Sequence, residues 1–519
     1  MNRRSLLHSA IPAAAGLAMA TCARRHGLVL PPLQSLAGWA GLLAAGKMTI
    51  PALTEHFLHR IRTLDQAGPL LRAVVEVNPD ALIIANRLGQ QTQRGLLHGI
   101  PVLVKDNMDT ADSMETTAGC LALLGGRRPE RDATVITRLR GAGAVLLGKT
   151  NLSEWANIRS PNSTSGWSAR GGLTLNPHHP GHSASGSSTG SAVAVAAGFA
   201  TAAIGTETNG SIVSPASACG IVGLKPTTGL VSRAGIIPIT RWQDTAGPMT
   251  LTVWDAALVL NVIAGVDARD GFTTAAAGHI CPDYTAGLTA KGLRGKRLGI
   301  LRAECGSHPG VLALFDRALN HLREAGAEIV DNVDLPHEQE AGRLAWQCML
   351  TELRQDLNGY LEQRAAGVSS LAEVITYNED HRAQEMPYFG QEFFERAQLR
   401  GTPEAIAEAT TLRAEARRIA GPLGLDASLR AHALDALICP TNDPEGTVDL
   451  THGDTENRVA CTPAAVAGYP HLTVPMGLVD GLPVGLSFMG TAWSEQFLLA
   501  CGHAFEQVMP ARPTPTWVV

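Results

Sequence analysis

The stretch 205–220, GTETNGSIVSPASACG, contains the first side chain that could do chemistry. Ser211 follows Gly210 there, among small and polar residues, and a serine hydroxyl becomes a nucleophile when a positioned base removes its proton. No histidine or carboxylate stands beside Ser211 at the spacing of a standard relay. The base that would activate this hydroxyl must therefore come from another part of the chain.

A lysine is the best candidate for that base. The segment 99–110, GIPVLVKDNMDT, carries Lys105 at the end of an apolar, strand-like run, so the backbone is expected to deliver its amine into the protein interior. Burial disfavours a charged ammonium and can lower the pKa of a lysine by several units, which allows it to act as a general base. The alternative is a surface lysine paired with Asp106.

A third candidate, Ser187, lies in a Gly/Ser-rich loop that opens the helical stretch 191–198, SAVAVAAG. Taken alone, Ser187 and Ser211 are typical of hydroxyls that cap helices or stabilise turns. Their occurrence after Lys105, in this order, favours a catalytic set.

Residues 143–150, GAVLLGKT, match the G-x-x-x-x-G-K-T pattern of a phosphate-binding loop, which would indicate a nucleotide-binding protein. Such a loop follows a strand and needs small or polar interior residues whose N–H groups turn inward. Here the interior is the apolar run 144–147, and a helical stretch ending at Gly141 precedes it. The pattern therefore predicts a buried strand that contains Lys149, and nucleotide binding stays the alternative from another functional class.

Residues 186–190, GSSTG, match the G-x-S-x-G of a hydrolase nucleophile elbow, which would make Ser188 the nucleophile. That elbow needs an apolar strand immediately before it, so that the serine is exposed at the end of the strand. The preceding segment, 176–185, is instead a polar loop with two prolines. The sequence therefore argues against an elbow at Ser188.

Three histidines, His178, His179 and His182, raise the question of a metal site. Pro180 and Gly181 interrupt the helix that would align two of them on one face, and the chain has no H-E-x-x-H motif. We therefore interpret them as loop histidines and predict neither a metal nor another cofactor.

The composition is that of an ordinary soluble globular protein. Of the 519 residues, 45% are hydrophobic and 17% are charged, and the formal net charge of −5 indicates no basic surface for nucleic acid. Nine cysteines are scattered without a C-x-x-C pair, which is typical of neither a zinc site nor a compact disulfide framework.

The N-terminus has the features of an export signal. Arg3 and Arg4 precede an alanine-rich apolar run that is too short to span a bilayer, and the tripeptide 18–20, AMA, suits a signal peptidase. We therefore expect residues 1–20 to be a signal peptide of the twin-arginine type, cleaved near Ala20. The mature protein would then be periplasmic or secreted, and it would be cytoplasmic if the leader is not functional.

The rest of the chain divides into segments that differ in their helical or strand-like sequence pattern. Residues 27–70 are predicted to be helical, and 95–265 alternate strand-like and helical runs, which indicates a layered α/β core. Residues 280–432 are richer in charge and in helical periodicity, which predicts a mostly helical lobe over that core. Strand-like runs and a final helix in 433–510 predict a return to the core.

Together these segments resemble the amidase signature family of serine hydrolases. The resemblance rests on GIPVLVKDN, GAVLLGKTNLSEWA, SASGSSTGSAVAVAAG, GTETNGSIVSPASACGIVGLKPT and AVAGYPHLTVPMGLVDGLPVGLSFMG, which occur in the family's order. It covers nearly everything after the leader, so residues 27–519 are expected to form an amidase domain. The resemblance implies an α/β/α sandwich around a large mixed β-sheet core, with a mainly helical lobe and without a cofactor.

The resemblance also implies roles for three residues. Lys105, Ser187 and Ser211 match the family's catalytic triad, in which the middle serine is held by a cis peptide bond and the last serine is the nucleophile. The implied reaction is hydrolysis of a carboxamide to a carboxylate and ammonia through an acyl-enzyme intermediate. Backbone N–H groups of Thr208, Asn209 and Gly210, with that of the nucleophile, are expected to bind the developing oxyanion.

Three residues depart from the family's usual sequence. Ser185 and Thr189 stand where glycines are common, and Asn209 stands where many members have the glycine before the Gly-Ser pair. Asparagine tolerates a left-handed backbone better than most residues, so an oxyanion site can be retained. These changes are expected to affect substrate preference more than chemistry.

Several stretches are most similar to peptide amidases, the members that remove the C-terminal amide of peptides: SEWANIRS, SGWSARGG, GTETNGSI, AGYPHLTVPMG and FMGTAWSE. The alternative within the same fold is the A subunit of a tRNA-dependent amidotransferase, which carries the same triad but needs partner subunits. The predicted leader argues against it. A small-molecule or peptide amide is thus the expected substrate, without a nucleic-acid partner or a membrane span, and the sequence specifies neither the acyl group nor the oligomeric state.

Overall fold

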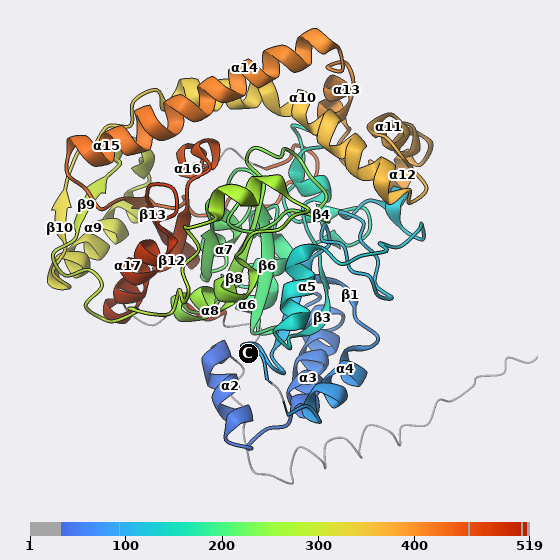
Figure 1. Ribbon diagram of the computed structural model, residues 1–519, viewed down its shortest axis with the longest axis horizontal. Helices are drawn as coiled ribbons and strands as arrows, with labels where there is room; N and C mark the ends of the chain where they lie inside the picture. The colour runs from blue at the N-terminus through green and yellow to red at the C-terminus, as the bar shows by residue number, and fades with distance from the viewer. Residues whose placement is uncertain (1–32, 93, 455–456, 510–511, 516–519) are drawn as a thin grey trace, which may run out of the picture.

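The computed structural model describes residues 33–92, 94–454, 457–509 and 512–515. The predicted leader, residues 1–20, lies outside these ranges. Helices surround a central sheet on both faces, and long helices arch over one end of it (Figure 1). Within the described ranges no helix is both long and apolar enough to cross a bilayer.

In the described part of the chain, eleven strands form one mixed sheet in the order β1-β3-β2-β6-β8-β7-β12-β13-β11-β9-β10. Its parallel pairs are β3 with β2, β2 with β6, β11 with β9 and β9 with β10, and the other neighbours are antiparallel. The strands are β1 (Val74–Val77), β2 (Pro101–Lys105), β3 (Val145–Thr150), β6 (Ala202–Glu207), β7 (Val222–Lys225), β8 (Thr245–Thr250), β9 (Arg297–Ile300), β10 (Glu328–Val330), β11 (Ala436–Pro440), β12 (His471–Val479) and β13 (Leu482–Met489). A separate two-stranded hairpin pairs β4 (Trp167–Ser168) with β5 (Gly172–Leu173).

The sheet is buried on both faces because its strands alternate between two apolar clusters. Val102 and Val104 belong to one cluster and Leu103, between them, belongs to the other. This is the period of two that a strand imposes on its side chains. The arrangement confirms the predicted α/β class and the large mixed sheet, with helices in a layer on each side.

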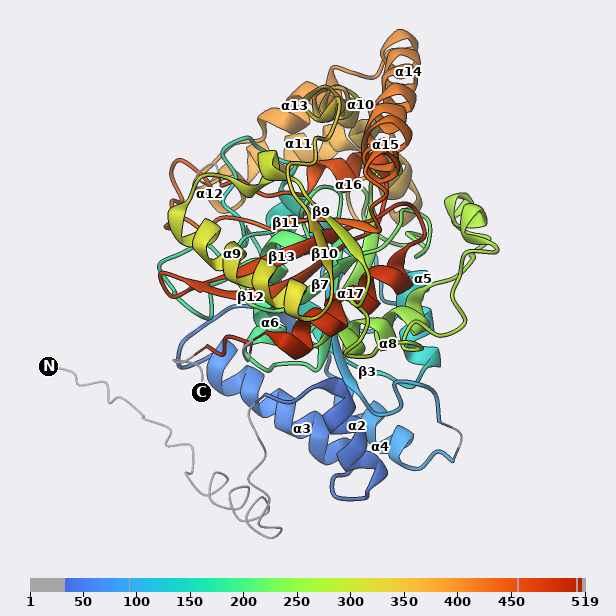
Figure 2. The same ribbon diagram turned by 90° about the vertical axis from the view of Figure 1, so that its left-hand side faces the viewer.

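Each layer is made of amphipathic or wholly buried helices. The cluster that contains Val102 is closed by α5 (Thr134–Gly141), α8 (Val253–Ile263), α9 (Pro309–Glu324) and α17 (Glu495–Val508). The cluster that contains Leu103 is closed by α3 (Ile50–Arg60), α4 (Ala81–Gly89), α6 (Thr189–Ala196) and α7 (Val213–Ala218). Figure 2 shows α3 and α4 lying together with α2 (Leu36–Ala44) at the lower end of the molecule. Of these, α2 and α3 lie in the segment 27–70 that was predicted to be helical.

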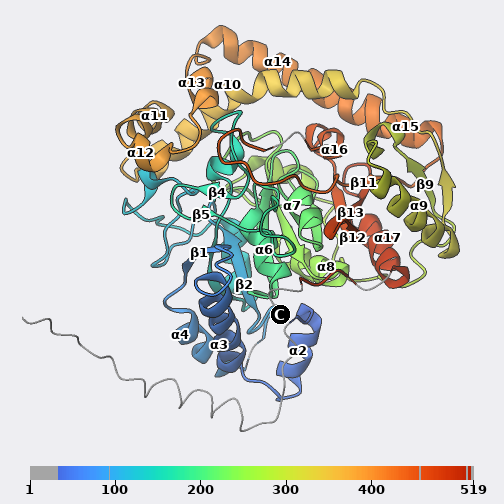
Figure 3. The ribbon, with the colours of Figure 1, turned by 180° about the vertical axis from the view of Figure 1, so that it is seen from behind.

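A lobe of helices covers the opposite end of the sheet. The two long helices 338–364 and 403–420 pack along each other and form the arch in Figures 1 and 3. The lobe consists of α10 (Glu338–Arg364), α11 (Leu371–Asp380), α12 (Arg382–Glu385), α13 (Glu392–Gln398), α14 (Pro403–Ala420) and α15 (Asp426–Ala431), with α16 (Thr462–Ala467) beneath it.

The lobe begins later than the pattern of 280–432 suggested. The first part of that segment supplies β9, α9 and β10. In the main sheet β9 pairs with β11, and β10 pairs with β9 at the edge. These strands have only four and three residues, and the charged amphipathic helix α9 between them dominates the local pattern. Parallel pairing of β9 with β11, and of β10 with β9, determines their place, and the local sequence cannot show this pairing.

Candidate active site

Lys105 is the last residue of β2 and is fully buried. Its Nζ lies 2.8 Å from Ser187 Oγ and 3.0 Å from both Ser188 Oγ and Thr206 Oγ1. Neighbouring strands β3 and β6 pair with β2 in parallel and so end at the same edge of the sheet. The strand therefore delivers the amine to hydroxyl groups inside the protein, as the sequence predicted.

The environment of Lys105 favours the neutral amine. Burial lowers its pKa from 10.5 to about 7, and the carboxylates of Asp244 and Glu207 oppose part of this shift. The contacting groups are hydroxyls, which can accept from an amine and donate to it. A substantial fraction of Lys105 is thus uncharged near neutral pH, which is the state that can accept a proton from Ser187.

Ser187 occupies the loop that leads into α6, and the helix keeps this loop at the end of β2 and β6. The hydroxyl is buried, its carbonyl oxygen accepts from the backbone N–H of Ser153 at 3.1 Å, and the peptide bond between Gly186 and Ser187 is cis, as the resemblance implied. A Cβ at Gly186 would lie 2.3 Å from Ser153 Oγ. Only glycine therefore fits beside Ser187.

Ser211 lies in the turn between β6 and α7 and is partly exposed. Glu207 organises this turn, since one of its carboxylate oxygens accepts from the N–H groups of Ile212 and Val213 at 2.8 and 3.0 Å. The carbonyl oxygen of Ser211 accepts from the N–H of Ser188 at 3.1 Å, which joins the two serine segments. Within the described residues the Ser211 hydroxyl forms no hydrogen bond, so it is free to meet a substrate carbonyl.

The predicted oxyanion residues precede Ser211 in this turn. Gly210 has φ +85°, and a Cβ there would lie 3.0 Å from Cys461 Sγ, so both conformation and space require glycine. Asn209 is exposed and donates from Nδ2 to Thr462 Oγ1 at 3.3 Å. It does not adopt a left-handed backbone, contrary to the reason given above for its tolerance, because Gly210 alone supplies the positive φ at this turn.

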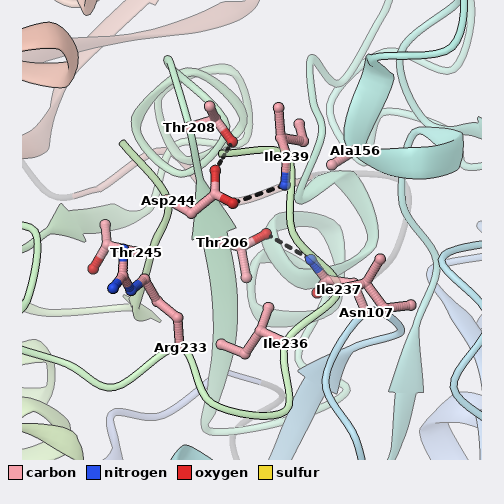
Figure 4. Close-up of a pocket in the computed structure, with 10 residues that line it drawn as sticks. All are labelled: Asn107, Ala156, Thr206, Thr208, Arg233, Ile236, Ile237, Ile239, Asp244 and Thr245. Carbon is pink, nitrogen blue, oxygen red and sulfur yellow. Dashed lines mark hydrogen bonds between the residues drawn. The ribbon is translucent and has the colours of Figure 1, made fainter. Parts of the chain in front are cut away.

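Figure 4 shows a pocket whose wall includes Thr206, the residue whose hydroxyl accepts from Lys105. It is lined by Asn107, Ala156, Thr206, Thr208, Arg233, Ile236, Ile237, Ile239, Asp244 and Thr245. Asp244 accepts from the Thr208 hydroxyl at 2.6 Å and from the N–H of Ile239 at 2.8 Å, and Asn107 donates to Thr206 Oγ1 at 3.0 Å. Desolvation raises the pKa of Asp244 to about 6. The pocket thus combines apolar walls with a fixed carboxylate, Asp244, whose charge raises the pKa of Lys105.

The other serine of the GSSTG motif, Ser188, faces inward. Its hydroxyl donates to Thr206 O at 3.0 Å and accepts from the backbone N–H of Thr206 at 3.1 Å. It is fully buried, and the preceding segment forms no regular strand. Ser188 therefore orients Lys105 rather than standing exposed at a strand end, which agrees with the sequence argument against an elbow.

Lys149 does not form a phosphate-binding loop. Residues 145–150 are strand β3 and the preceding helix α5 ends at Gly141, as predicted. The Lys149 Nζ is buried and donates to Met108 O at 2.7 Å and to Thr116 Oγ1 at 2.8 Å. The lysine thus ties β3 to the loop that follows β2.

Replacement of Lys149 by methionine is expected to cost stability without removing function. It removes a buried donor from Met108 O and Thr116 Oγ1, although the Thr116 hydroxyl still donates to Met108 O at 3.1 Å, so the expected cost is about 1–2 kcal/mol. Chemical denaturation measures this loss. Nucleotide titration of the wild-type protein by calorimetry should give no heat of binding, and a saturable signal would contradict the assignment of β3.

Contacts with other parts of the protein hold two of the three loop histidines. His178 Nε2 lies 3.0 Å from Cys219 O, and His182 Nδ1 lies 2.7 Å from Glu445 O. The His179 and His182 rings meet edge to face at 4.5 Å between centroids. These contacts hold the segment that leads to Ser187.

A different group, Cys120, Glu154 and Glu385, has the composition of a metal site. All three are buried, but Arg159 lies among them, pairs with Glu154, and stacks its guanidinium over the Phe389 ring at 4.4 Å. Burial raises the pKa values of Cys120 and Glu385, which disfavours the anionic ligands that a metal needs. Arg159 thus supplies the positive charge, and the cluster joins α12 to the core.

Sequence reasoning missed several groups around the lysine. Thr206, Glu207 and Asp244 lie far from Lys105 in the chain, and β6 and the loop before β8 bring them to it. Thr206 and Glu207 belong to the GTETNGS stretch, so their proximity to Ser211 was a usable signal. No residue pattern near Asp244 in the sequence indicates that it belongs to the site.

Comparison with known proteins shows the family to which this chain belongs. The Amidase family model matches residues 52–499. The chain belongs to the amidase family. The structure of native peptide amidase from Stenotrophomonas maltophilia is 49% identical, with a TM-score of 0.88 over 93% of this chain and 98% of that one.

Two relatives found by sequence carry names of different activities, an amidase and an amidotransferase subunit. A probable amidase of Arabidopsis thaliana is 38% identical, covering 91% of this chain and 89% of the relative. The A subunit of the glutamyl-tRNA(Gln) amidotransferase of Chloroflexus aurantiacus is also 38% identical, covering 90% and 94%. The family makes this protein a hydrolase of amide bonds, and the predicted family and activity are confirmed.

Proposed function

We propose that the protein hydrolyses C-terminal carboxamides of peptides through Lys105, Ser187 and Ser211. The observation that carries the mechanism is the 2.8 Å contact between the buried Lys105 Nζ and Ser187 Oγ. Neutral Lys105 takes the Ser187 proton as Ser187 takes that of Ser211, and the Ser211 oxygen attacks the amide carbonyl. The N–H groups of residues 208–211 bind the oxyanion that forms.

The second half of the reaction uses the same groups in reverse. The proton held by Lys105 returns through Ser187 to the amide nitrogen, so the C–N bond breaks and ammonia leaves. Water then enters, gives one proton to the relay, and its oxygen attacks the carbonyl carbon of the acyl-enzyme ester. The bond between that carbon and Ser211 Oγ breaks, the relay returns its proton to Oγ, and the product loses its remaining proton to solvent and leaves as a carboxylate.

The preference for peptide amides is supported by similarity to a solved peptide amidase at 49% identity. Measurement of ammonia release from a panel that contains peptide amides, aliphatic amides and aryl amides tests it. We expect kcat/KM to be at least about tenfold higher for the peptide amides, because their backbone can form additional contacts in the transition state. Equal values across the panel would contradict the preference but leave the amidase activity intact.

The alternative is the A subunit of a tRNA-dependent amidotransferase, which the similarity to the Chloroflexus aurantiacus protein keeps open. Such a protein would be expected to co-purify with its partner subunits. Purification of tagged protein from its own host, followed by mass spectrometry, distinguishes the two. Stoichiometric partner subunits would favour the amidotransferase.

We also propose that residues 1–20 direct export. The paired Arg3 and Arg4 before an alanine-rich run support this. Edman sequencing of the mature protein should begin close to residue 21, and a sequence beginning at Met1 would contradict export.

Replacement of Asp244 by asparagine should shift the pH dependence of activity. The Asp244 carboxylate raises the pKa of Lys105, so its loss lets that pKa fall further and moves the acidic limb of kcat/KM to lower pH. Asparagine can keep its oxygen on the N–H groups of Ile239 and Thr240 and place its nitrogen towards Thr208. An acidic limb that stays at the wild-type pH would contradict the electrostatic effect of Asp244 on Lys105.

A further inference from the structure

Ser185 holds a position where glycine was the expected residue. Its φ is +60°, in the left-handed region that favours glycine, and its side chain is buried. A residue with a Cβ is strained there, so its retention requires compensating contacts. Ser185 lies two residues before Ser187, so these contacts also affect the loop of Ser187.

Every polar group of Ser185 is engaged. Its N–H donates to Ser183 Oγ at 3.0 Å, and its carbonyl oxygen accepts from the Thr189 hydroxyl at 2.6 Å. Its own hydroxyl lies 2.7 Å from Ser214 Oγ. The two residues that replace glycines in this loop, Ser185 and Thr189, therefore bind each other, and one of them also reaches another element.

The contact with Ser214 links the segments of the two proposed catalytic serines. Ser214 is buried in α7, three residues after Ser211, and its N–H donates to Gly210 O at 2.8 Å. Another direct link is the hydrogen bond from the backbone N–H of Ser188 to the carbonyl oxygen of Ser211. The Ser185–Ser214 pair thus fixes the loop of Ser187 against the turn of Ser211 from the opposite side of the cis bond.

A buried carboxylate, Glu445, lies near this pair. It accepts from Asn442 Nδ2 and Asn457 Nδ2, each at 3.0 Å, and the Ser185 hydroxyl favours its charged form by lowering the pKa that burial raises. The backbone of Glu445 is also held, since its carbonyl oxygen lies 2.7 Å from Nδ1 of the His182 ring.

We propose that Ser185 is a positioning residue that, through Ser214, sets the distance between the hydroxyls of Ser187 and Ser211. This inference rests on the proposed function, because it concerns proton transfer between those two serines. Transfer requires both oxygens within hydrogen-bond reach, and small displacements slow such steps strongly. Loss of the link should therefore lower kcat and leave KM nearly unchanged.

A double-mutant cycle with Ser185→Gly and Ser214→Ala tests the proposal. Glycine accepts φ +60° without strain, so any loss in the first variant reports the missing hydroxyl. Each single variant is expected to lower kcat for ammonia release about tenfold, and the double variant is expected to lose no more than either single one. Melting temperatures of all variants are measured alongside.

Ser428→Ala is the matched control, since this buried serine of α15 donates to Asp334 O, in the lobe and away from the site. It should keep the wild-type kcat. Unchanged kcat in Ser185→Gly, or losses that multiply in the double variant, would overturn the positioning role while the amidase function stands. A wild-type protein that releases no ammonia from any amide would instead overturn the proposed function itself.

Discussion

Alanine at position 211 is expected to reduce amide hydrolysis by about 10⁴-fold or more in kcat, with little change in fold. The Ser211 hydroxyl forms no hydrogen bond within the described residues and is partly exposed, so its removal leaves no buried group unsatisfied. Ammonia release under substrate saturation measures the effect. A serine-directed fluorophosphonate should label the wild-type protein and fail to label this variant.

The control for Ser211→Ala is Ser428→Ala, which removes a hydroxyl from the lobe. It should keep both kcat and fluorophosphonate labelling. Residual hydrolysis of more than a few per cent in Ser211→Ala would mean that another group attacks the amide, and the assignment of the nucleophile would then be wrong.

Replacement of Lys105 by methionine is the second change expected to have a large effect. It removes the proposed base while keeping an unbranched apolar stem in the interior, so kcat should fall by about 10³-fold to 10⁴-fold. Lys149→Met is a close control, because that lysine is equally buried on the adjacent strand but contacts no catalytic serine. Equal losses in both variants, per folded molecule, would contradict the role of Lys105.

The wild-type pH profile follows from the same lysine. Only its neutral form accepts a proton, so kcat/KM should rise with pH through about 7, the pKa that burial gives Lys105. The free energy of unfolding is expected to change with pH in the same direction. Because the unfolded chain binds a proton at this site up to about pH 10.5 and the folded chain only up to about 7, the free energy of unfolding should increase with pH between these values.

The burial of Lys105 could be predicted from the sequence because it ends an apolar run, whereas the roles of Ser187 and Ser211 came from the family resemblance. An apolar run ending in Lys105 specifies a strand that buries its last side chain, and the Gly/Ser loop before 191–198 specifies a helix start. The same reasoning distinguished β3 from a phosphate loop. The cis bond before Ser187 came from the family resemblance and not from any local property.

The surroundings of these three residues could not be predicted in the same way. Asp244 and Glu445 are brought to the site by segments far along the chain, and no local pattern marks either. The strands β9 and β10 are too short to be distinguished from the amphipathic helix between them. These features depend on which elements pair across the sheet, and long-range pairing of this kind is not encoded in local periodicity.

The most direct measurement is the pKa of the Lys105 amine itself. The chain has six lysines, so ¹³C labelling of their Cε atoms gives few NMR signals, and Lys105→Met identifies the one that belongs to the site. A titration midpoint at about 7 is expected for this signal. A midpoint near 10.5, the ordinary value, would show that the amine is charged at neutral pH and would contradict its role as the base.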